Sequence, residues 1–333
     1  MMPPTRQNNG SPLLDVRDLR VAFRTPDGVL EAVRGISFSV DRGRVLGIVG
    51  ESGSGKSVAT QTMVGLTQGA RVSGEAFFEG ENLLAMPPEQ LRAIRGRGIA
   101  MIFQNPLSSL HPFYRVGWQI VEMIQAHDAM TKRLARTRAI ELLGLVGIPR
   151  PDRRVDDYPH QFSGGMLQRA MIAMALALNP RLLVADEPTT ALDVTVQAQI
   201  LRLLRRVQQE FGMAVILITH DLGVIAEVAD EVVVMYAGRA MEAAPRRELF
   251  RAPSHPYTRG LLESIPRADG EGARLTPIRG QPPSAIAPPP GCPFHPRCAH
   301  AFERCRANVP PLIPVPGVAR HLSACWLGEE GRP

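Results

Sequence analysis

Eight consecutive residues have the types and spacing of a loop that binds phosphate. Residues 50–57 read Gly-Glu-Ser-Gly-Ser-Gly-Lys-Ser and fit the pattern G-x-x-x-x-G-K-[ST]. Glycines let successive backbone N–H groups turn toward phosphate oxygens, Lys56 adds a positive charge, and Ser57 offers a hydroxyl to Mg²⁺. An apolar run precedes the loop and a helical pattern follows it, a context that a ligand-free Gly-rich turn does not need. We therefore predict that a nucleoside triphosphate contacts Gly50, Glu51, Ser52, Gly53, Ser54, Gly55, Lys56 and Ser57.

Two adjacent acidic residues follow the apolar run 182–185. A buried strand there would deliver Asp186 to the edge of a sheet, where its carboxylate can hold Mg²⁺ through water. Glu187 comes next and is suited to polarise the water that attacks the terminal phosphate. Two acids after a strand can also cap a helix, but the phosphate-binding pattern upstream favours the catalytic interpretation.

Two further motifs narrow the chemistry. Residues 162–169 read Phe-Ser-Gly-Gly-Met-Leu-Gln-Arg, a turn of small residues that opens a helix. The N-terminus of a helix attracts anions, so this turn is a second phosphate-binding element, and one monomer does not need two for one γ-phosphate. His220 directly follows the apolar run 215–219. A lone histidine is more often structural, but at a strand end in a phosphate-loop protein we predict a contact with the γ-phosphate.

These residues require a sheet whose strands end near one another. From residue 181 onward, apolar runs alternate with helical patterns, which predicts a parallel α/β core. Residues 13–21 and 35–40 alternate as antiparallel strands do, and residues 113–178 are rich in helical pattern. The predicted core strands are 45–49, 99–103, 182–185, 215–219 and 231–236.

Composition bounds the possible partners. The chain has 333 residues, 44% hydrophobic and 5% aromatic, with a formal net charge of +6. Few aromatics argue against a base-stacking surface, whereas the positive charge permits nucleic acid or an anionic membrane. No apolar run reaches the ~18 residues that cross a bilayer, and residues 1–12 lack the apolar core of a secretory signal. We expect a cytosolic chain that reaches a membrane only through a partner.

A change in composition divides the chain. We expect a disordered lead over residues 1–12, a catalytic domain over 13–250 and a C-terminal extension over 251–333. The extension is rich in Pro, Gly and Arg, and it carries all four cysteines.

The motifs in residues 50–57, 162–169, 182–188 and 218–221 together resemble the ATP-binding cassette of ABC transporters over about residues 13–250. The resemblance implies a phosphate-loop NTPase fold with a parallel sheet core, an antiparallel β subdomain and a helical signature subdomain. It also implies adenine stacking on Phe23, Mg²⁺ and water contacts by Gln104, and the catalytic base and switch roles for Glu187 and His220. The resemblance assigns Ser163, Gly164, Gly165 and Gln168 to the signature motif, which would bind the γ-phosphate of the opposite subunit. It assigns Asp193 to the D-loop.

Three other segments point to one kind of cassette. Residues 101–112, 255–262 and 292–298 resemble the oligopeptide and dipeptide importer ATPases of the OppD and DppD type. The absence of sustained heptads excludes the long coiled-coil arms of chromosome-structure ATPases, and a single phosphate loop argues against the ribosome-associated type.

The resemblance implies a peripheral subunit on the cytoplasmic face of the bacterial inner membrane. It would bind ATP and Mg²⁺ and pair with a second ATPase of the OppF or DppF type. Two permeases and an extracytoplasmic substrate-binding protein complete the expected partners. Nickel or glutathione are alternative cargoes, and a soluble cassette acting on nucleic acid is a rival, although no nucleic acid is expected.

The four cysteines form the pattern C-x5-C-x6-C-x19-C. A cytosolic location disfavours disulfides, and the spacing lacks the C-x2-C pairs usual for structural zinc. Four thiolates suit a four-iron–four-sulfur cluster, and the family resemblance implies one on Cys292, Cys298, Cys305 and Cys325. Zinc and free thiols are the alternatives. We expect the metal centre to hold together a Pro-rich tail that buries little apolar surface by itself.

Overall fold

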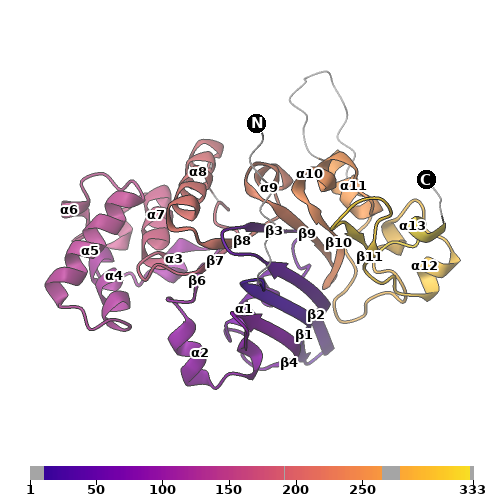
Figure 1. The fold of residues 1–333 in the computed structure, drawn as a ribbon, viewed down its shortest axis with the longest axis horizontal. Helices are drawn as coiled ribbons and strands as arrows, with labels where there is room; N and C mark the ends of the chain where they lie inside the picture. The colour runs from indigo at the N-terminus through magenta and orange to yellow at the C-terminus, as the bar shows by residue number, and fades with distance from the viewer. Residues whose placement is uncertain (1–10, 191, 265–277, 331–333) are drawn as a thin grey trace.

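The computed structural model describes residues 11–190, 192–264 and 278–330. Two sheets occupy the middle of the molecule, a group of helices lies at one end, and the C-terminal extension lies at the other (Figure 1). The predicted disordered lead falls outside the described residues except for its last two positions.

The larger sheet carries the residues predicted to do chemistry. Its strands β9, β3, β8, β7 and β6 run parallel, and every residue of β3, β7 and β8 is buried. Carboxyl ends of parallel strands meet at one edge of a sheet, so the segments that follow these strands converge there. In sheet order, the strands are β11 (Ile313–Pro314), β12 (Leu322–Ser323), β10 (Arg239–Pro245), β9 (Glu231–Tyr236), β3 (Val45–Val49), β8 (Ala214–Thr219), β7 (Leu182–Asp186) and β6 (Ile99–Ile102).

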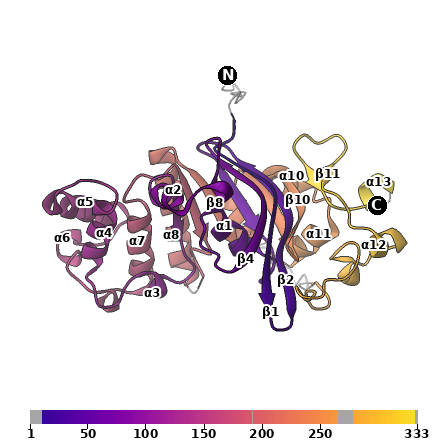
Figure 2. The same ribbon diagram turned by 90° about the horizontal axis from the view of Figure 1, so that it is seen from below.

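The smaller sheet is antiparallel and packs beside the first (Figure 2). Both predicted antiparallel strands are present, but each is longer than its alternating segment. The pairing of β1 is irregular between Val16 and Leu19 and again between Val21 and Ala22, so the inward and outward positions shift along the strand. In sheet order, the strands are β2 (Gly28–Val40), β1 (Leu14–Thr25), β4 (Ala70–Phe78) and β5 (Glu81–Asn82).

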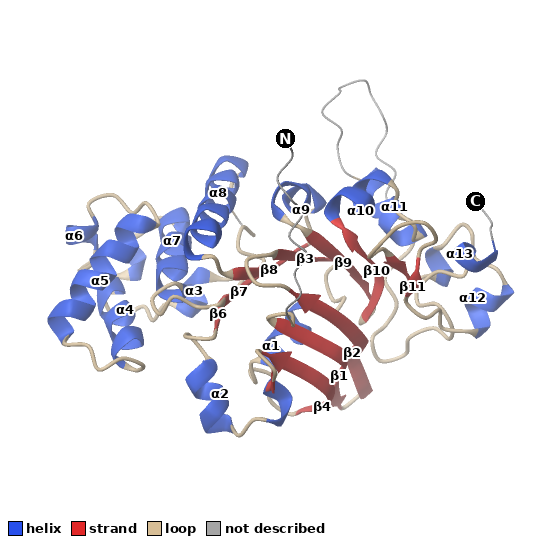
Figure 3. Cartoon of the chain, viewed as in Figure 1, coloured by secondary structure: helices blue, strands red, loops and turns tan. Residues whose placement is uncertain are grey.

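Helices flank the larger sheet and form the arm at one end of the molecule (Figure 3). Within the described residues, no helix has the length and apolar character that crossing a bilayer requires. The helices are α1 (Lys56–Met63), α2 (Pro88–Ile94), α3 (Pro106–Ser109), α4 (Val116–Gln125), α5 (Lys132–Leu145), α6 (Pro151–Arg154), α7 (Gly164–Ala175), α8 (Val194–Phe211), α9 (Leu222–Val228), α10 (Arg246–Arg251), α11 (Pro256–Glu263), α12 (Glu303–Ala307) and α13 (Leu327–Glu330).

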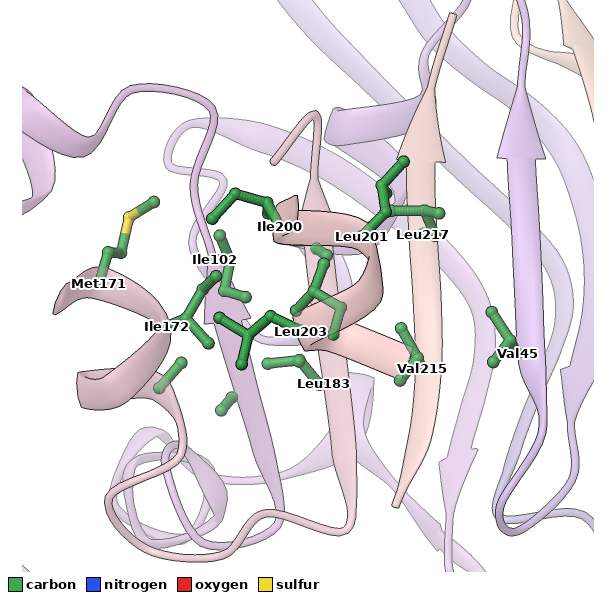
Figure 4. Packing of buried hydrophobic residues seen from close by; sticks show 14 of the residues in the cluster. Val45, Ile102, Met171, Ile172, Leu183, Ile200, Leu201, Leu203, Val215 and Leu217 are labelled. Carbon is green, nitrogen blue, oxygen red and sulfur yellow. The ribbon is translucent and has the colours of Figure 1, made fainter. Parts of the chain in front are cut away.

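Two clusters of buried side chains hold these layers in place. One lies where α7 and α8 cover the larger sheet: Ile200 and Leu203 of α8 lie over β7 and β6, close to Ile172 of α7 (Figure 4). The other lies between the two sheets and includes Ile48 of β3 and Val21 of β1. Burying each such side chain contributes about 1.5–3 kcal/mol relative to leaving it in water, so the strand ends are rigidly placed.

The C-terminal extension is part of the same core. Its strands β12 and β11 continue the larger sheet beyond β10. Tyr257, Phe294 and Trp326 are buried in the cluster that also holds α7 and α8. The expectation that the tail buries little apolar surface is therefore wrong.

The predicted metal centre is also wrong. Among the residues that the structure describes, no group of three or more His, Cys, Asp or Glu side chains is placed to hold a metal ion. The cysteines are free thiols. Burial raises the pKa of Cys292 to about 12 and that of Cys325 to about 11, and it also raises the pKa of Cys298. The four residues assigned to the iron–sulfur cluster were Cys292, Cys298, Cys305 and Cys325.

Candidate active site

The phosphate loop connects β3 to α1, and its glycines are required by close contacts. A Cβ at Gly50 would lie 2.1 Å from the carbonyl oxygen of Met235, and one at Gly55 would lie 2.2 Å from that of Ala32. Gly55 also has a φ of +94° and Gly53 a φ of +77°, a region that other residues rarely adopt. The loop backbone is therefore pressed against its neighbours, as a preformed cradle must be.

Lys56 lies at the centre of the loop. Its side chain is 5% exposed, and its ammonium donates to the carbonyl oxygens of Gly50 (2.8 Å) and Glu51 (3.0 Å). Burial lowers the pKa of Lys56, and the carboxylates of Glu187, Asp186 and Glu51 act in the opposite direction. A buried ammonium on a glycine-rich loop is suited to neutralise phosphate oxygens.

Ser57 and Asp186 meet between α1 and the end of β7. The Ser57 hydroxyl donates to Asp186 at 2.7 Å, and the amide of Gln61 donates to the other carboxylate oxygen at 3.4 Å. Burial is the main cause that raises the pKa of Asp186. A hydroxyl beside a carboxylate offers the hard oxygen ligands that Mg²⁺ prefers, so these residues fit that ion.

Glu187 is the meeting point of three side chains. Its carboxylate accepts hydrogen bonds from Thr190 (2.8 Å) and Gln104 (3.0 Å), and His220 Nδ1 lies 3.4 Å from its other oxygen. Burial alone raises the pKa of Glu187, but hydrogen bonds with Thr190 and His220 and electrostatic attraction by His220 and Lys56 together leave that pKa below its usual value. The carboxylate is ionised at neutral pH and can accept a proton. The backbone of Glu187 has a φ of +47°, which is unusual for a residue with a side chain.

The second predicted phosphate-binding turn faces outward. Ser163 caps α7 by accepting a hydrogen bond from the Met166 N–H, and Ser163 and Gly164 are exposed. Among the described residues outside its own helical turn, a Cβ built on Gly164 would have no neighbour within 4 Å, whereas one on Gly165 would meet Val196 at 3.0 Å. The turn thus leaves its N–H groups open to a ligand from outside.

The other predicted residues lie in several places. Phe23 is on β1, paired with Leu30 and Ala70 of the neighbouring strands. Gln168 is buried in α7, at 2% exposure. Asp193 caps α8 through a hydrogen bond from the Val196 N–H at 3.0 Å. The structure therefore brings Lys56, Ser57, Gln104, Asp186, Glu187 and His220 together, and it does not bring Ser163, Gly164, Gly165 or Gln168 into that group.

Sequence reasoning missed residues that contact the site. Thr190 lies three positions after Glu187, which was a usable signal. Tyr257 and Arg297 contact Glu51, the second residue of the phosphate loop. Both lie in segments that carry the family resemblance, but no spacing rule links them to a loop more than two hundred residues earlier.

Comparison with known proteins identifies the family of the chain. Residues 33–190 match the family model for the ABC transporter, and residues 241–305 match the one for the oligopeptide/dipeptide transporter, C-terminal region. The chain is 52% identical to the oligopeptide transport ATP-binding protein OppD of Salmonella typhimurium, over 96% of this chain and 94% of that protein. It is 49% identical to the dipeptide transport ATP-binding protein DppD of Bacillus subtilis, over 96% and 95% of the two chains.

A solved structure has the same fold. The ATP-binding cassette MJ0796, in a dimeric post-hydrolysis state bound to ADP and Pi, superposes with a TM-score of 0.64. It is 27% identical to this chain and covers 70% of it, with 99% of its own length matched. By sequence, fold and site, the chain belongs to the ABC transporters, in the family of oligopeptide and dipeptide transport ATP-binding proteins.

Proposed function

We propose that the chain is the ATP-hydrolysing subunit of a bacterial importer that couples ATP binding and hydrolysis to the uptake of dipeptides or oligopeptides. The observation that carries the proposal is the convergence on Glu187. An ionised carboxylate, an amide and an imidazole meet beside the Ser57–Asp186 pair, all at the carboxyl edge of the parallel strands. This is the arrangement that activates a water next to a bound triphosphate.

Each residue has a role in this proposal. The N–H groups of residues 50–57 and the ammonium of Lys56 bind the phosphates, and Phe23 stacks on the adenine. Ser57, Asp186 and Gln104 would hold Mg²⁺, which supplies charge neutralisation at the β- and γ-phosphates. Glu187 accepts the proton of the attacking water, and His220 contacts the γ-phosphate. Gln104 would also contact the attacking water, and its amide donates a hydrogen bond to Glu187.

The remaining site residues act across a subunit interface. Ser163, Gly164 and Gly165 face outward, so we propose that they bind the γ-phosphate held by a second, related ATPase subunit, with Gln168 and Asp193 supporting that interface. The dimeric state of the similar cassette MJ0796 agrees with this assembly. The ATPase domain would span residues 13–250 and the extension residues 251–333.

Two permeases would hold the chain at the cytoplasmic face of the membrane. Residues 105–112 follow Gln104, and exposed aromatic side chains lie next to them. Phe113 is 81% exposed, and Tyr114 and Trp118 are 45% and 38% exposed. Apolar surface of this kind fits a permease helix that moves with Gln104 when nucleotide binds.

The test is ATP hydrolysis by the complex purified with its permeases and second ATPase. A binding protein loaded with dipeptide or oligopeptide should stimulate hydrolysis. Stimulation by nickel or glutathione alone would contradict the peptide cargo. Co-purification with nucleic acid in place of permeases would contradict the transport function altogether.

A further inference from the structure

The C-terminal extension forms hydrogen bonds with one residue of the phosphate loop, Glu51. Arg297 donates through Nη1 and Nη2 to the two carboxylate oxygens of Glu51, at 2.8 and 3.1 Å. The backbone N–H of Glu51 donates to the Tyr257 hydroxyl at 3.0 Å. The extension therefore holds the same loop residue by its side chain and by its backbone.

Arg297 is itself fixed before it meets Glu51. Its side chain is only 6% exposed. Its Nε donates to the carbonyl oxygen of Arg279 at 2.9 Å, and Nη1 also lies 3.2 Å from the Tyr236 hydroxyl. Rings of Tyr236, Tyr257 and Phe294 pack against one another beneath it. A guanidinium held in one orientation loses little freedom when it pairs with a carboxylate.

The negative charge of Glu51 explains why its ion pair with Arg297 affects nucleotide binding. A loop that binds a polyanion carries a carboxylate at its second position, and that charge acts on Lys56 strongly enough to influence its pKa. Without a partner, the carboxylate of Glu51 would also repel a triphosphate bound to the loop. Such repulsion between like charges is strong where solvent is excluded. The guanidinium of Arg297, which belongs to the extension, neutralises the charge of Glu51.

We propose that Arg297 is a positioning residue for nucleotide binding, which neutralises and orients Glu51 so that the phosphate loop accepts ATP. The C-terminal extension is then part of the nucleotide site and not only a surface appendage. The inference rests on the proposed nucleotide site.

The experiment measures MgATP affinity of the full-length chain, and KM and kcat of hydrolysis in the assembled complex. The variants are Arg297→Gln, Glu51→Gln and the double variant, with Lys56→Ala as the reference for loss of the site. Arg320→Gln is the matched control, because Arg320 pairs the extension with Glu231 of β9 away from the loop and is 60% exposed. Arg297→Lys keeps the charge without the two-pronged geometry, and it serves if Arg297→Gln does not fold.

We expect Arg297→Gln to raise Kd and KM for ATP about five- to tenfold, because the unpaired Glu51 carboxylate then repels the triphosphate, with kcat within about twofold. Arg297→Lys should give an intermediate value, and Arg320→Gln should not change either constant. Adding Glu51→Gln to Arg297→Gln should restore affinity to within about twofold of Glu51→Gln alone, because the unpaired charge is gone.

The outcomes separate the two proposals. If Lys56→Ala binds ATP like the wild type, the nucleotide site itself is misassigned. If Lys56→Ala loses binding while Arg297→Gln and Arg297→Lys match the wild type, the positioning role is refuted and the site stands. Strictly additive effects of the Arg297 and Glu51 substitutions, or an equal effect of Arg320→Gln, would also refute it.

Discussion

The chain contains two turns of small residues that each open a helix, and the structure surrounds them differently. The phosphate loop before α1 is enclosed: Lys56 is buried, and Gly50 and Gly55 press against backbone carbonyls of other segments. The turn before α7 is open, and no other segment in the part of the chain that the structure describes lies within 4 Å of a Cβ on Gly164. The first turn can bind phosphate with groups of its own chain. The second has the same kind of chemistry, but the structure leaves it exposed, which is why we propose that it acts at an interface with a second subunit.

The largest expected effect tests the enclosed side of this comparison. Replacing Glu187 with Gln removes the proton acceptor but keeps a side chain of the same shape. Hydrolysis by the assembled complex should fall about a thousandfold, the typical contribution of a general base, while MgATP affinity stays near that of the wild type. Steady-state phosphate release and equilibrium nucleotide binding measure the two quantities. Turnover at the wild-type rate would show that another group accepts the proton.

For the open turn before α7, we predict a loss of ATP hydrolysis that depends on the partner subunit. Gly164→Asp places a carboxylate where the proposed γ-phosphate of the second subunit would lie, and the open space leaves the fold unchanged. Hydrolysis by the complex should fall about a hundredfold, the cost of one lost transition-state contact. The isolated chain should bind MgATP as the wild type does. A binding defect in the isolated chain would mean that the turn serves its own subunit's nucleotide.

The smallest expected effect compares the two turns by stability alone. An alanine at position 55 would have to adopt a φ of +94°, and its Cβ would lie 2.2 Å from the Ala32 carbonyl oxygen. The free energy of unfolding should therefore fall by about 1–3 kcal/mol. Alanine at Gly164 should change the unfolding free energy by less than about 0.5 kcal/mol. Urea unfolding of the two full-length variants measures this difference. Equal losses would show that the open turn is packed in solution.

Much of the local structure was predictable because local patterns determine it. The apolar run of residues 45–49 forms β3 with the expected bounds, and the helical pattern expected between the strands 182–185 and 215–219 forms α8. The antiparallel strands were predicted too short, because the register shifts in β1 break the alternation that marks a strand. Glu187 and His220 were predicted from strand ends and Gln104 from the family resemblance, and parallel pairing explains why the three meet.

The cysteines show where the family resemblance misleads. The sequence identifies four thiols but does not show whether their side chains are placed to hold an ion. In the structure, Cys292 and Cys305 are buried among apolar side chains, and burial raises the pKa of Cys292 to about 12. The Pro-rich extension is stabilised by packing and by two strands added to the larger sheet, which composition could not reveal.

What the sequence by itself determined is the local chemistry: glycines where the backbone needs positive φ, a lysine and a serine at the start of a helix, and acids at the end of a buried strand. Each of these follows from neighbours a few residues away. Only the tertiary structure decided that Arg297 pairs with Glu51 across 246 residues of chain, and that the turn at Ser163 faces outward. Contacts between distant residues depend on how whole elements pack, and no periodicity or spacing within the chain records that packing.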